Sequence, residues 1–121
     1  MTDIFVFGSN LAGRHGKGAA KHALDHHGAV YGQGWGLQGA SFGIPTKDGK
    51  LNTLSVQNIQ FYVDQFRAFA SAAPGLTFNV TLIGCGLAGY TPKDIGPLFH
   101  SMPPNVKLPP EFEAVLRERR A

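Results

Sequence analysis

Short apolar runs alternate along the chain with segments in which apolar residues recur at helical spacing. The runs are rich in β-branched and aromatic side chains and are bounded by turn-forming residues, so each predicts a buried strand. The spaced segments predict helices, because side chains three or four positions apart share one face. Strands are expected at residues 4–8, 40–44 and 78–83, and helices at 19–27, 55–73, 91–102 and 111–120.

Start and stop signals fit these boundaries. Gly28 follows the first helical segment, where a left-handed residue commonly ends a helix. Ser55 is an N-cap candidate for the longest helix, which Pro74 terminates. Thr91 and Pro92 supply N-cap and first-turn signals for the next one.

Two shorter apolar segments, 29–31 and 105–108, predict additional strands. Strands that alternate with helices favour a mostly parallel sheet covered by helices. The expected fold class is therefore α/β, with a three-layer α/β/α arrangement and a mixed, mostly parallel sheet. Because 121 residues is a common size for one domain, residues 1–121 are expected to form a single domain.

Composition and charge narrow the class of protein. The formal net charge is +3, and residues 117–120 supply +2 of it, so the body carries little excess charge. Its basic residues are scattered, which suits one bound anion better than a long polyanion. No apolar run reaches the roughly 18 residues of a membrane span, and the start shows no signal-peptide pattern. With a single cysteine, a reducing, cytoplasmic setting is expected and no membrane partner.

Glycine is the strongest compositional signal, with 16 of 121 residues. Two glycine-rich loops each follow a predicted strand, and ligands of parallel sheets bind beyond the carboxyl ends of strands. Backbone N–H groups in such loops, with the N-terminus of a following helix, can bind a pyrophosphate. Alternatively, the glycines only permit tight turns. The spacing of the glycines matches neither the P-loop motif nor the dinucleotide-binding fingerprint. The glycines are Gly13, Gly16 and Gly18 in the first loop and Gly84, Gly86 and Gly89 in the second.

These loops resemble those of macrodomains. Residues 6–20 look like the macrodomain strand that ends at an asparagine before a glycine-rich loop and a helix. One branch of the macrodomains removes terminal ADP-ribose from acidic side chains or DNA bases. Residues 83–87 are similar to the phosphate-enclosing loop of that branch, and residues 44–47 also resemble it. The resemblance covers about residues 4–102. The whole chain also looks like a short macrodomain-like group of bacteria and phages, which implies a macrodomain-like fold that binds ADP-ribose or a related nucleotide.

The resemblance implies roles for individual positions. Asn10 would lie near the distal ribose, and Lys47 matches the lysine that attacks the anomeric carbon in the hydrolase branch. Ala88 stands where that branch carries its catalytic aspartate, so an acid–base group is missing. His15 is a candidate donor to phosphate or ribose. The other expected ligand contacts are Gly13, Gly16, Lys17, Gly18, Gly84, Cys85, Gly86, Leu87, Ala88, Gly89 and Tyr90.

Adenine has no assigned partner, because the earlier strand and the adenine-binding aspartate of macrodomains have no counterpart here. Trp35, Tyr90 or Phe42 could stack on the base, and each fits a core position equally well. Asp48 or Asp94 could replace the missing acid.

The sequence contains no clear metal-binding or cofactor-binding motif. His22 and His26 stand four residues apart on one predicted helix, but no third ligand accompanies them. No metal and no cofactor are expected, and the sequence gives no oligomeric state.

The sequence is consistent with three functions. One is an ADP-ribosyl glycohydrolase that uses Lys47 on modified protein or DNA. Another is a non-catalytic module that senses or sequesters ADP-ribose. A nucleic-acid-binding domain that uses Arg14, Lys17 and residues 119–120 is the third, and it would show a much steeper salt dependence.

Overall fold

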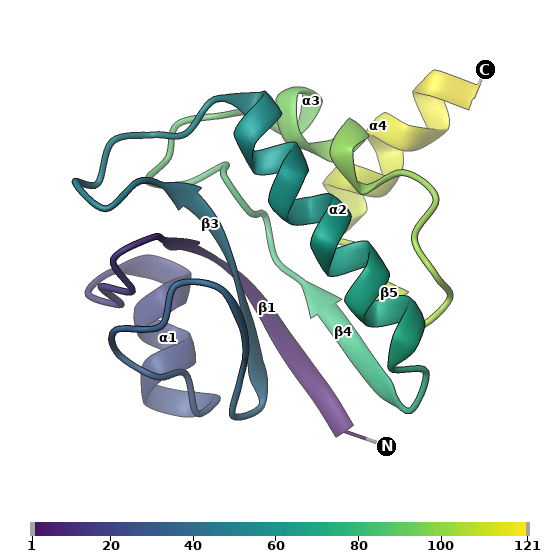
Figure 1. The fold of residues 1–121 in the computed structure, drawn as a ribbon. Helices are drawn as coiled ribbons and strands as arrows, with labels where there is room; N and C mark the ends of the chain where they lie inside the picture. Colours follow the sequence, from purple (N-terminus) through teal and green to yellow (C-terminus); the bar gives the residue numbers. More distant parts are fainter. Residues whose placement is uncertain (1, 121) are drawn as a thin grey trace.

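The fold is taken from a computed structural model that describes residues 2–120, except for the side chains of Arg119 and Arg120. Strands and helices alternate along most of the chain (Figure 1). In chain order they are β1 (Thr2–Asn10), α1 (Gly18–His26), β2 (Gly36–Gln38), β3 (Ser41–Lys47), α2 (Val56–Ala72), β4 (Leu76–Val80), α3 (Pro92–Ile95), the 3-10 helix η1 (Gly96–Phe99), β5 (Val106–Lys107) and α4 (Pro110–Arg120).

The sheet has five strands in the order β2-β3-β1-β4-β5. β1 pairs in parallel with both β3 and β4, and β5 is parallel to β4, whereas β2 is antiparallel to β3. The predicted α/β class and mixed, mostly parallel sheet are therefore confirmed. The arrowheads of β1, β3 and β4 all point toward the upper left of Figure 1, so their carboxyl ends meet at one edge.

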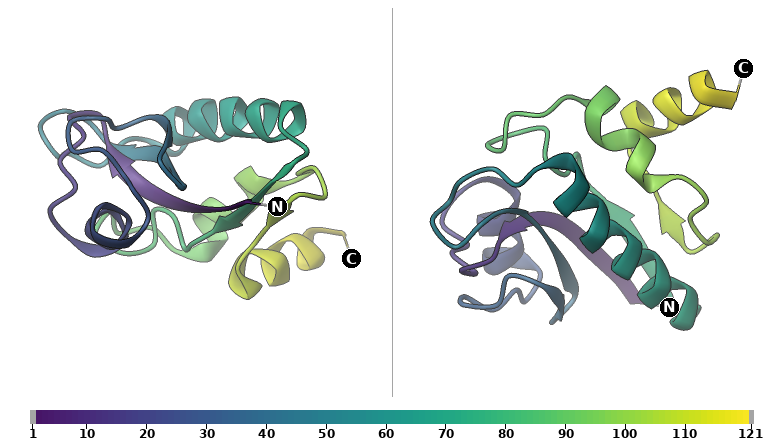
Figure 2. Two further views of the ribbon diagram at one scale, coloured as in Figure 1. Left: turned by 90° about the horizontal axis from the view of Figure 1, so that it is seen from below. Right: turned by 45° about the horizontal axis from the view of Figure 1, so that its top comes forward.

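Alternating side chains of β1 supply both layers of the core. Ile4 and Val6 belong to a large apolar cluster with α2, β3 and β4, whereas Phe7 packs with buried alanines of α1. The left view of Figure 2 shows α1 and α2 on opposite sides of β1. This arrangement gives the three layers α/β/α, because a sheet buried on both faces needs a helix on each.

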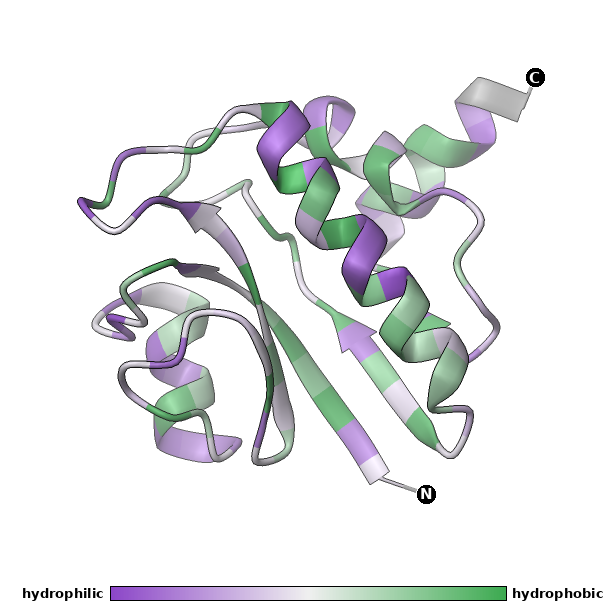
Figure 3. Cartoon of the chain, in the orientation of Figure 1, coloured by the Kyte–Doolittle hydropathy of each residue, from purple (hydrophilic) through white to green (hydrophobic). Residues whose placement is uncertain are grey.

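The longest helix follows its sequence signals closely. The Ser55 hydroxyl accepts a hydrogen bond from the backbone N–H of Asn58 at 3.2 Å and so caps α2. The residues that α2 buries recur at helical spacing, and Figure 3 shows hydrophobic and hydrophilic segments alternating along this helix.

Several predicted elements differ from the observed ones. Residues 29–31 form no strand; the chain turns there, and the edge strand is β2 instead. The helix expected over 91–102 is divided into α3 and η1, since Pro97 lacks the N–H that would continue the first helix. β5 is shorter than the strand expected at 105–108. β4 ends at Val80, so the last three residues of the strand expected at 78–83 lie beyond it. The described part of the chain contains no helix long and apolar enough to cross a membrane.

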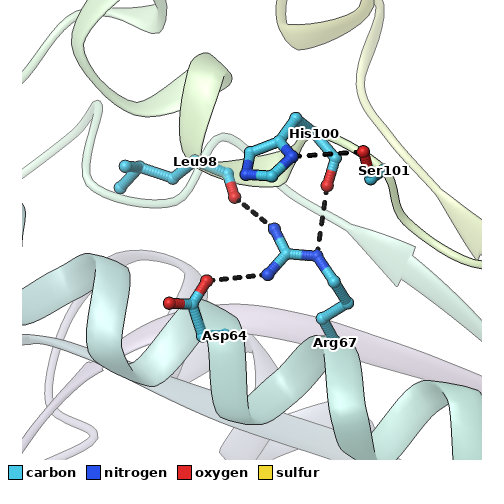
Figure 4. A network of polar contacts seen from close by, with 5 residues as sticks. All are labelled: Asp64, Arg67, Leu98, His100 and Ser101. Atoms are coloured by element: carbon cyan, nitrogen blue, oxygen red, sulfur yellow. Dashed lines mark hydrogen bonds and ion pairs between the residues drawn. The ribbon is translucent and has the colours of Figure 1, made fainter.

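Arg67 joins α2 to η1 and to the residue that follows η1 (Figure 4). Its guanidinium donates to the carbonyl oxygens of Leu98 at 2.7 Å and His100 at 3.1 Å, and to the carboxylate of Asp64 at 2.7 Å. The ion pair with Asp64 should contribute little to the stability of the fold, because the Asp64 side chain is half exposed. The two hydrogen bonds to carbonyl groups should contribute more to stability, since they join elements far apart in the sequence.

Arg67→Leu is expected to lower the free energy of unfolding by about 1–3 kcal/mol, because the carbonyl groups lose a charged donor. Urea unfolding followed by circular dichroism measures this. Arg117→Ala is the matched control: its ion pair with Glu113 spans 3.8 Å between exposed side chains, so a change below about 0.5 kcal/mol is expected. Equal changes in the two variants would contradict a structural role for the Arg67 contacts.

Candidate functional site

A cavity of about 640 Å³ opens at the edge where β1, β3 and β4 end. It lies between the two glycine-rich loops, with the ends of β1 and β3 as its floor. This volume is within the usual range of small-molecule sites. The predicted site residues that line it are Asn10, Gly16, Lys17, Gly18, Lys47, Gly84, Gly86, Leu87 and Ala88.

Asn10 shapes the first loop. Its side-chain amide donates to the carbonyl of Arg14 and accepts from the N–H of the same residue, each at 2.9 Å. The register between β1 and β3 shifts at this point, so Asn10 lies opposite Lys47. Because its amide is bonded to the main chain of Arg14, Asn10 holds the loop that carries the Arg14 side chain to the cavity.

Gly13 belongs to the packing of this loop, and the cavity lining does not include it. Its φ is +69°, and a Cβ there would overlap the main chain of Gly32. The Gly32 N–H also donates to the Gly13 carbonyl at 2.8 Å. This close approach holds residues 28–35 against the first loop.

The N-terminus of α1 opens into the cavity. Lys17 is the N-cap residue, and no side chain caps the helix there. The first N–H groups of a helix have no intrahelical partner. Here they belong to Gly18, Ala19 and Ala20, and all three residues line the cavity. The positive end of the helix dipole therefore faces the space where a ligand would lie.

The second loop is a closed turn attached to the segment after β3. The Tyr90 N–H donates to the Gly84 carbonyl at 2.9 Å, and the Tyr90 hydroxyl donates to the Leu54 carbonyl at 2.7 Å. Thr53 reaches the Ala88 carbonyl at 3.1 Å. These bonds present Gly86, Leu87 and Ala88 to the cavity, whereas Gly89 and Tyr90 lie outside its lining.

Cys85 also lies outside the lining. Its thiol is half-buried and lies 3.6 Å from the Ile83 carbonyl. Burial, reinforced by Asp94 and Glu111, raises the pKa of the thiol, which keeps it protonated and poorly nucleophilic.

All charged side chains in the described lining are cationic. They belong to Arg14, Lys17 and Lys47, and the lining includes no aspartate, glutamate or histidine. Asp48 and Asp94, the candidate substitutes for the missing acid, are both engaged in local turns instead.

The carboxylate of Asp48 accepts from the backbone N–H groups of Asn52 and Lys50, and these bonds lower its pKa. The carboxylate of Asp94 accepts from the N–H and hydroxyl of Thr91, at 2.9 and 3.0 Å, and so closes the capping box of α3. Both groups therefore stabilise loops and lie outside the cavity lining.

His15 is placed in the interior. Only 1% of its surface is exposed, its Nε2 lies 3.1 Å from the side-chain oxygen of Gln38, and its ring packs edge-on against Phe7. It is not among the residues that line the cavity. A phosphate or ribose contact would require this ring to leave its position.

None of the three aromatic residues considered for base stacking lines the cavity. Phe42 is fully buried, Trp35 packs against it at a centroid distance of 5.1 Å, and Tyr90 is bonded to Leu54. The aromatic residue that does line the cavity is Tyr31. Its position follows from the contact between Gly13 and Gly32, which no local sequence pattern signals.

The histidine pair of α1 lies on the surface. The rings of His22 and His26 are 4.7 Å apart, and His27 stacks on Phe5. Within residues 2–120, no group of three or more histidine, cysteine, aspartate or glutamate side chains is arranged to hold a metal ion.

The arrangement combines unpaired helix N–H groups, glycine-lined walls and three cations around one cavity. Such a set is suited to a compact anion, because both backbone dipoles and side-chain charges favour negative charge. No protein-family model, curated protein or solved structure matches this chain.

Proposed function

We propose that this protein binds ADP-ribose or a closely related nucleotide between its two glycine-rich loops. The observation that carries the proposal is the lining of the cavity: three cations and the uncapped N-terminus of α1, with no carboxylate among the described lining residues. A pyrophosphate matches these groups in charge and size. The resemblance of the loops to macrodomain loops favours ADP-ribose as the nucleotide.

Binding without efficient hydrolysis is the form that the cavity supports best. Lys47 lines the cavity and could attack an anomeric carbon, but general acid–base catalysis also needs a group that moves protons. Ala88 occupies the cavity wall without such a group, and Asp48 and Asp94 are engaged in turns. We therefore rank a sensing or sequestering role above an ADP-ribosyl glycohydrolase acting on protein or DNA.

The salt dependence of binding separates this proposal from nucleic-acid binding. Arg14 and Lys17 line the same cavity as Lys47. We expect the affinity for ADP-ribose, measured by calorimetry, to fall less than about tenfold between roughly 50 and 200 mM salt, because few counterions are released. A single-stranded oligonucleotide serves as the comparison ligand. Tighter binding of the oligonucleotide, with a loss of about a thousandfold over the same range, would favour the nucleic-acid alternative.

A further inference from the structure

The uncharged polar side chains of the cavity are bonded to the protein's own main chain. The Ser9 hydroxyl donates to the Gly34 carbonyl, and the Thr46 hydroxyl donates to the Ser9 carbonyl at 3.3 Å. The Thr81 hydroxyl donates to the Val6 carbonyl at 2.8 Å. These bonds use the one donor of each hydroxyl and hold the strand ends together. The oxygens of Ser9 and Thr46 keep lone pairs, but both residues are only 4% exposed.

The Asn10 amide is occupied in the same way by the main chain of Arg14. The charged lining residues, Arg14, Lys17 and Lys47, are donors that lack acceptor atoms in their side chains. The exocyclic amine of adenine needs an acceptor if its edge is to be recognised. No carboxylate in the described lining supplies one. The acceptors that remain are hydroxyl and carbonyl oxygens, which can accept from the N–H donors of any base, so the lining binds phosphates well but does not single out adenine.

Exposed apolar side chains border the same cavity. Tyr31 is 60% exposed and Leu87 is 65% exposed, and both line it together with Leu51. They come from three segments far apart in the sequence. Leu87 extends over the start of α1, where its Cδ1 lies 3.6 Å from the position that a Cβ of Gly18 would take. Apolar surface therefore adjoins the anion-binding groups.

We propose that the nucleobase of the bound nucleotide lies against the exposed ring of Tyr31 and that the cavity accepts different bases with similar affinity. This inference rests on the proposed function and adds the specificity of the site. Contact between a base and an aromatic ring is tolerant of sequence, because every base has a π-face. Strong discrimination arises instead where a site must pair the donors and acceptors of its ligand. The ligand class is thus a nucleoside diphosphoribose of any common base.

Calorimetry with ADP-ribose and with its guanine, cytosine and uracil counterparts tests the inference. The four dissociation constants are expected to agree within about threefold. Tyr31→Ala should weaken all four by about tenfold, since loss of a stacking ring typically has an effect of this order. Tyr31→Phe, which keeps the ring, should restore most of the affinity. Phe61→Ala, which removes an exposed ring from α2 outside the cavity lining, should have no effect.

Three other results of these titrations would contradict the inference, the placement of the base or the proposed function. A preference for adenine of more than tenfold, or a Tyr31→Ala effect confined to one base, would refute the inference and leave ADP-ribose binding standing. Equal binding of all four ligands that is unaffected by Tyr31→Ala would refute the placement of the base. If a folded wild-type protein binds none of the four, the proposed function fails and the inference fails with it.

Discussion

Gly86→Val is expected to abolish ADP-ribose binding without unfolding the protein, and Gly16→Val should do the same from the opposite wall. Both glycines line the cavity, and a Cβ added to either one meets no heavy atom within 4 Å. A branched side chain can therefore be accommodated by the fold but would fill space that the phosphates need. We expect a loss of more than a hundredfold in affinity, or about 2.7 kcal/mol, measured by calorimetry.

Gly75→Val is the matched control for these two variants. A Cβ at Gly75 also meets no heavy atom within 4 Å, and this residue precedes β4 at the other end of the sheet. Circular dichroism and urea unfolding should show all three variants folded, with only the control retaining affinity. Wild-type affinity in both cavity variants would place the ligand elsewhere. An equal loss in the control would show that valine acts through stability.

Ala88→Asp is expected to raise the hydrolysis of ADP-ribosylated glutamate or DNA by a hundredfold or more over a slow or undetectable wild-type rate. The substitution adds a carboxylate to a cavity that Lys47 already lines, and a positioned general acid or base contributes about 10²–10⁴-fold. Release of free ADP-ribose, followed by chromatography, measures the rate. Ala88→Asn, of similar shape but unable to transfer a proton, is the matched control and should remain slow.

Lys47→Ala tests the other half of that mechanism. It should remove any turnover of the wild-type protein and any covalent lysine adduct detected by mass spectrometry, while weakening ADP-ribose binding only modestly because Arg14 and Lys17 remain. Fast wild-type turnover that survives Lys47→Ala would show that a different group performs the chemistry. Asp48 or Asp94 would then have to leave its turn to do so.

Local patterns were sufficient for most of the fold because its central strands, β1 and β3, are largely buried. Buried strands appear as continuous apolar runs, as in residues 4–8. β2 was missed because its three residues, Gly36–Gln38, form no apolar run. Its position depends on the Gln38 side chain, which bonds to the main chain of Val30, Gln33 and Gly36.

The sequence best predicted those residues of the candidate cavity whose main chain forms its walls, although Asn10, Lys17 and Lys47, expected from the resemblance, also line it. Glycine marks such walls, and Gly16, Gly18, Gly84 and Gly86 do line it. Side-chain directions inside a loop depend on distant partners. The ring of His15 turns inward, where its Nε2 is hydrogen-bonded to the side-chain oxygen of Gln38, 23 positions away. Contacts at such separations leave no trace in a local pattern.

The central place of β1 in the sheet has a consequence for how the chain is made. β1 starts at Thr2 yet pairs along one side with β4, so Val6 lies beside Val80. During synthesis β1 must remain unpaired on that side until β4, more than 65 residues later in the sequence, has emerged. Pairings so distant in sequence slow folding, because the loop must close before its contacts can form. A nascent chain that stalls before residue 80 would thus expose an unpaired edge of a strand with four consecutive apolar residues, Ile4 to Phe7, and such an edge is a template for aggregation.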